Sequence, residues 1–276
     1  MSLTVIDWWA LALVVFIGLP HGAFDAAISL SMLRSAKKII RLAGILICYL
    51  LLAIVVVLVW YQLPEFSLLV FLIISVIHFG LADYAASPTR IKWAHVIAHG
   101  GIVAIGLPVI HKSEVEGLFA ILTNGPTPFL WDIMAILLIF WIGGALLHLY
   151  QTLRSKKHYL VGVELIGLII LAWIATPLVT FAIYFCLIHS RRHFTFIWKQ
   201  LQPISSKRVL INSALLLSAA SWLMGAGLYW YLHLEMSASN AALQTIFIGL
   251  AALTVPHMML IDLIFRPHST RITESD

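Results

Sequence analysis

The sequence has 276 residues, of which 62% are hydrophobic and only 11% are charged. Water-soluble domains carry about 25% charged residues, so this composition excludes a soluble protein and indicates an integral membrane protein. The formal net charge of +5 arises from short connectors, which argues against a nucleic-acid partner and makes the lipid bilayer the expected surroundings. The length fits one compact helical bundle, so we predict a single integral-membrane domain over residues 1–276.

Runs of roughly twenty apolar residues predict membrane-spanning helices along the chain. In chain order, these runs lie at 7–27, 39–60, 66–86, 91–110, 129–150, 159–176, 178–198, 209–232 and 241–265. The pattern predicts an all-α, polytopic transmembrane bundle of about nine spans. Eight spans are the alternative, because Thr176 and Pro177 indicate either a tight turn between two spans or a kink in one long helix.

The charges in the connectors indicate the orientation of the spans. Basic residues follow every odd-numbered span: Arg34, Lys37, Lys38, Arg41, Arg90, Lys92, Arg154, Lys156, Lys157, Lys199, Lys207, Arg208, Arg266 and Arg271. The alternate connectors carry Glu65, Glu114, Glu116 and Glu235. By the positive-inside rule, the odd spans end in the cytoplasm and the N-terminus lies outside. The one long connector, 111–128, contains "TNGPTP", a loop signal preceded by a short interfacial helix.

Several histidines lie deep within these predicted spans. At about 1.5 Å per residue from the outer end, His21 is roughly 20 Å deep, His78 about 18 Å, and His189 and His193 about 17 and 23 Å. Three helices therefore place imidazoles in one layer of the bilayer. Because His189 and His193 are four residues apart, their rings share one helix face and can reach one ion. Imidazole is a good ligand for Fe, Cu, Zn and Ni, so we predict an intramembrane metal site.

Depth alone leaves the choice of ligands open. His99, in "WAHVIAHGG", and His257, in "VPHMMLID", come out near the same layer. A lone histidine in a membrane span also serves as a hydrogen-bonding group between helices, and that alternative holds for each of these residues.

Carboxylates follow two of the histidines at short spacing. Asp25 follows His21 in "GLPHGAFD", where Pro20 and a glycine are expected to break or kink the helix, and Asp83 follows His78 in "VIHFGLAD". A carboxylate that accepts the second ring N–H fixes the tautomer of a metal ligand. Pairing with a basic residue near the cytoplasm is an equally good reading of both carboxylates. Arg191 and Arg192 are expected to extend toward the cytoplasmic interface, at least one of them by snorkelling.

Four of these motifs, read together, resemble one known family. "GLPHGAFD", "HFGLAD", "AHGG" followed by "GLP", and "HSRRH" are similar in content and order to the Brp/Blh family of bacterial and archaeal β-carotene 15,15′-dioxygenases. The resemblance covers essentially the whole chain. It implies a protein of the cell inner membrane that uses O₂ to cleave β-carotene into two molecules of all-trans retinal. It also implies that the retinal passes to a microbial rhodopsin.

The resemblance further implies an Fe(II) site with four histidine ligands, which carry over onto His21, His78, His189 and His193. Cleavage of a C=C bond with O₂ needs a redox-active metal, which favours iron over zinc. The residues expected around the site are Asp25, Asp83, His99, Glu164, Tyr184 and His257. Aromatic side chains near the ligands, suggested as lining for an apolar substrate tunnel, are Phe24, Phe79, Tyr184 and Phe185.

Other classes of protein also place histidines inside a membrane. A di-iron desaturase or hydroxylase usually carries HxxHH boxes, which this sequence lacks. A haem-binding electron carrier would have axial histidines on two spans, and the His189–His193 pair lies on one. A metal or proton transporter would spread polar groups along the membrane depth, whereas here they concentrate in one layer.

Overall fold

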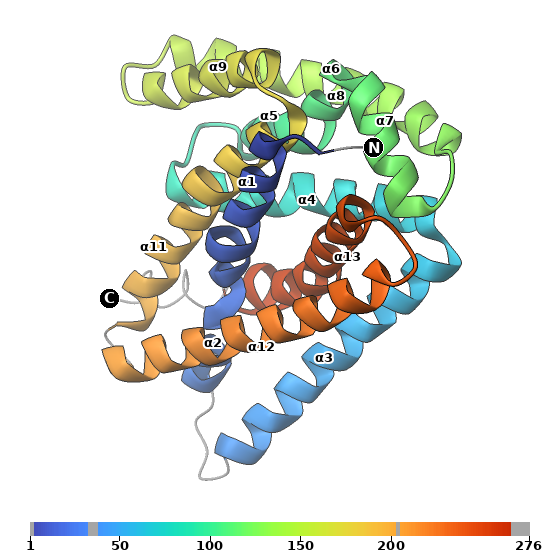
Figure 1. Ribbon diagram of the computed structural model, residues 1–276. Coiled ribbons are helices and arrows are strands. Elements are labelled where there is room, and N and C mark those ends of the chain that lie inside the picture. The colour runs from blue at the N-terminus through green and yellow to red at the C-terminus, as the bar shows by residue number, and fades with distance from the viewer. Residues whose placement is uncertain (1–2, 33–37, 203–204, 266–276) are drawn as a thin grey trace. The chain divides into compact units, whose positions relative to one another are not determined.

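The computed structural model describes residues 3–32, 38–202 and 205–265 (Figure 1). The side chains of His21, Met32, Lys38 and Ile39 lie outside this description, as do the basic connector residues Arg34, Lys37, Arg266 and Arg271. Every element in the described residues is helical, which confirms the all-α class.

Seven helices are long and apolar enough to cross a membrane within the described part of the chain. They cover Val5–Ser31, Ile40–Gln62, Pro64–Ala86, Lys92–Ile110, Pro128–Leu153, Lys207–His233 and Ala238–Phe265. Each corresponds to one of the runs predicted from the sequence. The structure is therefore that of a multi-pass membrane protein.

The two remaining predicted spans, 159–176 and 178–198, take a different form. Helix α9 (Tyr159–Ile174) is apolar but has only 16 residues. The second run is divided among α10 (Pro177–Ala182), the π-helical segment η4 (Ile183–Ser190) and α11 (Arg191–Leu201). Ala175 and Thr176 are extended, with ψ of 157° at both, so the chain breaks between two helices and does not kink within one. Nine membrane crossings stay a prediction.

The chain divides into two compact units. The first unit comprises residues 1–13 and 63–192, and the second comprises 14–62 and 193–276. Each unit thus combines segments that are far apart in the sequence. The prediction of one domain stays a prediction, and the two units are described separately.

In the first unit, α4 (Pro64–Ala86) packs on α5 (Lys92–Gly101), and α5 packs on α8 (Pro128–Leu153). Helix α8 in turn contacts α9. The α4–α5 contact depends on Gly80 and Gly100, because a Cβ atom on either would overlap the backbone of the other helix. Small residues allow such close approach of membrane helices. These two glycines belong to the "HFGLAD" and "AHGG" motifs, which explains why those motifs contain glycine. Further elements of this unit are α1 (Val5–Leu13), η3 (Ile102–Gly106), α6 (Leu107–Ile110) and α7 (Lys112–Thr123).

In the second unit, α13 (Ala238–Met258) packs on both α3 (Lys38–Gln62) and α12 (Lys207–His233). The helix around "GLPHGAFD" departs from α geometry, passing through the π-helical η1 (Val14–Gly18) and the 3₁₀-helical η2 (Leu19–Phe24) before α2 (Asp25–Met32). The π-helical η5 (Met259–Phe265) ends the described chain. A buried core joins η2, α2, α11, α12 and η5 through Phe24, Ala27, Ile28, Ile197, Leu201, Leu210, Leu260, Ile261 and Phe265.

Candidate active site

Two predicted metal ligands lie together in the first unit. His78 on α4 is 1% exposed and His189 in η4 is 0% exposed, and their ring centroids are 5.1 Å apart. The ring of Phe79 lies 4.6 Å from that of His189, and Phe185 stacks on it at 5.9 Å. A π-helical turn such as η4 is a frequent feature of functional sites, because it displaces side chains from the regular α-helical positions. The pair is thus held in an apolar, aromatic environment.

A second pair of imidazoles lies in the second unit. His193 on α11 and His257 on α13 are both buried, and their ring centroids are 4.9 Å apart. The backbone of His21 belongs to η2, and its side chain lies outside the described residues. Of the four histidines implied by the family resemblance, His78 and His189 therefore belong to the first unit and His193 to the second.

The described side chains include no group of three or more His, Cys, Asp or Glu residues placed to hold a metal ion, and His21 is not among them. The four-histidine set thus stays a prediction. The chemistry of the donors fits iron, since imidazole nitrogens are suitable ligands for it.

Asp25 orients one of these imidazoles directly. Its two carboxylate oxygens lie 2.9 Å from Nδ1 of His257, and the hydroxyl of Tyr49 donates to Oδ2 at 2.9 Å. A carboxylate partner holds the proton on Nδ1, so the lone pair of the ring is on Nε2. Gly22 packs over the pair, with room for a Cβ atom 3.5 Å from Nδ1. In the sequence, Asp25 follows His21 by four residues. Among the described side chains, its carboxylate binds His257 and Tyr49.

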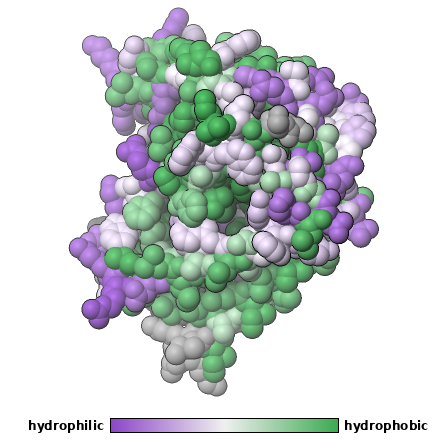
Figure 2. Space-filling view, in the orientation of Figure 1, coloured by the Kyte–Doolittle hydropathy of each residue, from purple (hydrophilic) through white to green (hydrophobic). Residues whose placement is uncertain are grey.

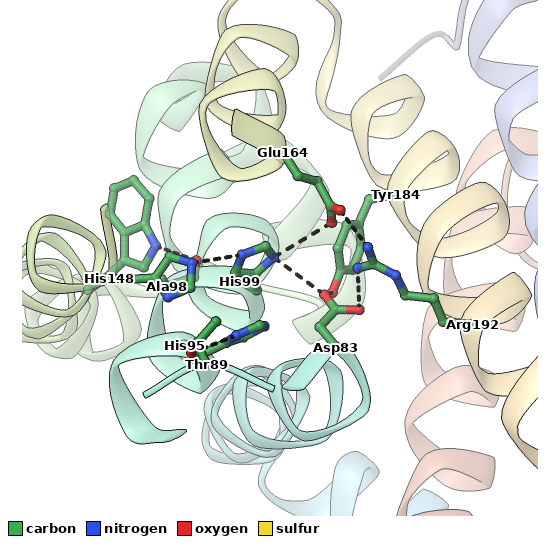
Figure 3. A network of polar contacts seen from close by, with 10 residues as sticks. Asp83, Thr89, His95, Ala98, His99, His148, Glu164, Tyr184 and Arg192 are labelled. Atoms are coloured by element: carbon green, nitrogen blue, oxygen red, sulfur yellow. Dashed lines mark hydrogen bonds and ion pairs between the residues drawn. The ribbon is translucent and has the colours of Figure 1, made fainter. Parts of the chain in front are cut away.

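Asp83 has a different set of partners (Figure 3). Arg192 donates to its Oδ1 at 3.0 Å, and the hydroxyl of Tyr184 donates to its Oδ2 at 2.9 Å. The other terminal nitrogen of Arg192 pairs with Glu164. Asp83 therefore makes the basic pairing that the sequence left open. Arg192 is only 18% exposed at its side chain, so it is held within this unit by two carboxylates.

Three histidines extend this network through α5 and α8 (Figure 3). Nδ1 of His99 lies 3.8 Å from both Asp83 and Glu164, and its Nε2 lies 3.3 Å from Nε2 of His148. The ring of His95 stacks on that of His99 at 4.4 Å. His99 thus lies in a buried polar cluster with the predicted residues Asp83, Glu164 and Tyr184.

Sequence reasoning missed two members of these networks, His148 and Tyr49, and it did not identify Arg192 as the basic partner of Asp83. His148 carries the same signal as the other histidines, an ionisable ring inside an apolar span, and that signal could have identified it. Tyr49 carries a hydroxyl within an apolar run, which is a weaker signal. The partners of Arg192 could not be read from the sequence, because they come from α4 and α9.

The fold and these networks define a class of protein: a multi-pass helical membrane protein with buried histidines and carboxylates in its interior. Residues 12–265 match the family model described as beta-carotene 15,15′-dioxygenase, and the chain belongs to this family. It is 68% identical over 272 residues to the beta-carotene 15,15′-dioxygenase of uncultured marine bacterium 66A03, covering 99% of this chain and 98% of that protein. No solved structure matches the chain.

Proposed function

We propose that this protein uses O₂ to cleave β-carotene at its central 15,15′ double bond, giving two molecules of all-trans retinal. One O₂ is consumed for each double bond broken, and each carbon of that bond gains one oxygen atom. The observation that carries the proposal is the 68% identity, over nearly the whole of both chains, to a protein that bears this activity in its name. The family match over residues 12–265 supports it independently of any one motif. The fold is consistent with a substrate that dissolves in lipid, since seven helices are apolar enough to cross a membrane.

We assign the metal to Fe(II), with His21, His78, His189 and His193 as its ligands. When bound, iron supplies the redox-active centre that O₂ needs in order to react with a C=C bond. His78 and His189 contribute buried nitrogen donors, and the rings of Phe79 and Phe185 exclude water from their surroundings. An apolar surrounding of this kind holds a hydrocarbon by shape and contact, because β-carotene offers no polar group to bind.

The residues around these ligands have separate roles in the proposal. Asp25 holds His257 in one orientation and one tautomer, next to His193. Asp83, Tyr184, Glu164 and His99 form the polar cluster of the first unit, which fixes α4, α5, α9 and η4 against one another.

The membrane arrangement that we propose has nine spans with the N-terminus outside, in the cell inner membrane. The basic connectors after the odd-numbered spans support this orientation. Retinal released into the same membrane would be accessible to a microbial rhodopsin, which stays the predicted recipient.

The test is to express the chain in cells that accumulate β-carotene and then to purify it. We expect loss of the carotenoid colour, formation of retinal, and about one iron per chain without a haem absorption band. Replacing His21, His78, His189 or His193 singly with alanine should abolish retinal formation. His233→Ala is the matched control, because His233 is exposed at the end of α12. No retinal from the unaltered chain would overturn the proposal, and two irons per chain would favour a di-iron enzyme.

A further inference from the structure

The second unit contains a cavity of about 270 Å³ between α3, α12, α13 and the η2–α2 segment. Six of its lining residues carry the argument: Tyr49, Ala53, Ser218, Ser221, Met224 and His257. Pockets that enclose whole small molecules measure roughly 300–1,000 Å³. A cavity of this size accommodates one part of a long molecule better than the whole of it.

The walls of the cavity are formed mainly by small and apolar side chains. On α12, Ser218, Ser221 and Met224 are spaced by three residues, so they form one strip along the helix face. Ala53 on α3 and Gly22 in η2 add further positions without a large side chain. This lining leaves depth for a flat hydrocarbon and offers few groups for a polar ligand.

One end of the cavity is formed by polar groups that bind one another. Asp25 accepts hydrogen bonds from Tyr49 and from Nδ1 of His257, and both of these residues line the cavity. The ring of His257 packs against that of His193, at 4.9 Å between centroids. Because His193 is one of the residues that we assign to the iron, this end of the cavity is the one next to the proposed chemistry.

The cavity also reaches the apolar surface of the unit. Two lining residues, Leu50 on α3 and Met224 on α12, are 47% and 53% exposed. Figure 2 shows apolar surface over the region of these helices. The exposed apolar residues there are Ile47, Leu50, Leu51, Ile54, Val55 and Leu58 on α3 and Leu215, Leu216, Leu223 and Met224 on α12. In a membrane, this opening faces the phase in which a carotenoid is dissolved.

We propose that this cavity is the binding site for one half of the carotenoid, entered from the lipid between α3 and α12. The cyclic end lies toward Leu50 and Met224, and the polyene runs along Ser218 and Ser221 with its central bond toward His257. This inference rests on the proposed function, because it takes its ligand and its orientation from the proposed cleavage at an iron held in part by His193.

A pair of variants on adjacent residues of α12 tests the proposal. Ser218→Phe fills the cavity, whereas Ala219→Phe places the same ring on the exposed side of the helix. We expect Ser218→Phe to lower kcat/KM for β-carotene by about tenfold or more through KM, because the added ring occupies volume that the polyene would fill. Iron per chain should stay unchanged in both variants, and Ala219→Phe should keep the kinetics of the unaltered enzyme. Unaltered KM in Ser218→Phe, or iron loss in parallel with activity, would overturn the proposal.

A second measurement does not depend on the large side chain being tolerated. Ser218→Cys and Ala219→Cys are compared in a Cys48→Ser background, since Cys48 is exposed and Cys186 is buried. Under argon, β-carotene binds without being cleaved. At about ten times its dissociation constant, it should slow labelling of position 218 by a membrane-permeable maleimide about tenfold, because only the empty cavity reacts. Position 219 should label at the same rate with and without the carotenoid.

Equal labelling rates at position 218 with and without β-carotene would overturn the cavity assignment, and so would equal protection at both positions. These failures differ from failure of the proposed function. An enzyme that makes retinal but shows no effect at position 218 retains the proposed function and loses only this site. If the unaltered enzyme makes no retinal, the proposed function itself is contradicted.

Discussion

The two units use a buried carboxylate in different ways. In the first unit, Asp83 is 0% exposed and binds the guanidinium of Arg192, a cation that Glu164 shares. In the second unit, Asp25 binds the imidazole of His257. A carboxylate paired with a cation compensates a buried charge, so loss of the carboxylate leaves Arg192 with one carboxylate partner in place of two. A carboxylate on an imidazole fixes a ring orientation and a tautomer. Asp83 therefore holds helices together, whereas Asp25 orients the ring of His257.

The largest expected effect distinguishes the imidazole pairs of the two units. His189→Ala should remove both iron and retinal formation, because His189 is an assigned ligand. His257→Ala should keep part of both, because His257 is assigned to the surroundings of the metal. Iron per chain, measured by elemental analysis, and retinal, measured by chromatography, report the two quantities separately. Equal and complete loss of iron in the two variants would place His257 among the ligands and end the distinction.

Asp83→Asn should destabilise the first unit strongly. Loss of a hydrogen bond between charged groups costs on the order of 1.5–3 kcal/mol, and Glu164 continues to compensate the charge of Arg192. Thermal unfolding in detergent, followed by circular dichroism, measures the effect, and Asp132→Asn on the exposed face of α8 is the matched control. The double variant Asp83→Asn with Arg192→Gln should lose less stability than the sum of the single variants. Strict additivity would show that the pair contributes little.

Much of the fold was predictable because length and apolarity determine it directly. Seven of the predicted spans correspond to helices of sufficient length and hydropathy, since a run of apolar residues specifies a spanning helix by itself. The break at Thr176 and Pro177 was predicted as one of two alternatives, and the extended backbone there identifies the one that occurs. The π-helical character of η4 was not predicted, because α- and π-helical turns use the same residue types.

The side-chain partners of the site were less predictable, for a physical reason. The sequence left each carboxylate with two alternatives, the histidine just before it or a basic residue, and it gave no sign that Asp25 binds His257, 232 residues away. Such partners depend on which helix faces pack together, and Gly80 and Gly100 set one of those contacts by allowing α4 and α5 to approach. The glycines were visible in the sequence, but their partner helices were not.

Asp25→Asn should act on the metal more than on the fold. An amide in place of the carboxylate weakens the partner of Nδ1 of His257, whose ring packs against the assigned ligand His193, so we expect Fe(II) affinity to fall by about tenfold or less. Titration of the purified apoprotein with Fe(II) under argon measures this affinity. The unfolding midpoint should change less than in Asp83→Asn. The reverse order, with stability falling most in Asp25→Asn, would remove the contrast between the two carboxylates.

The smallest expected effects come from the two tyrosines that donate to these carboxylates, and they sharpen the same contrast. Tyr49→Phe removes the hydroxyl bound to Asp25, and Tyr184→Phe removes the one bound to Asp83. Each carboxylate keeps its principal partner, so each variant should lose only about 1 kcal/mol of interaction. For Tyr49→Phe we expect this loss as a drop in Fe(II) affinity of a few fold, and for Tyr184→Phe as a lower unfolding midpoint with affinity unchanged. If both variants altered only stability, Asp25 would be a structural residue like Asp83, and the orientation of His257 would not matter to the metal.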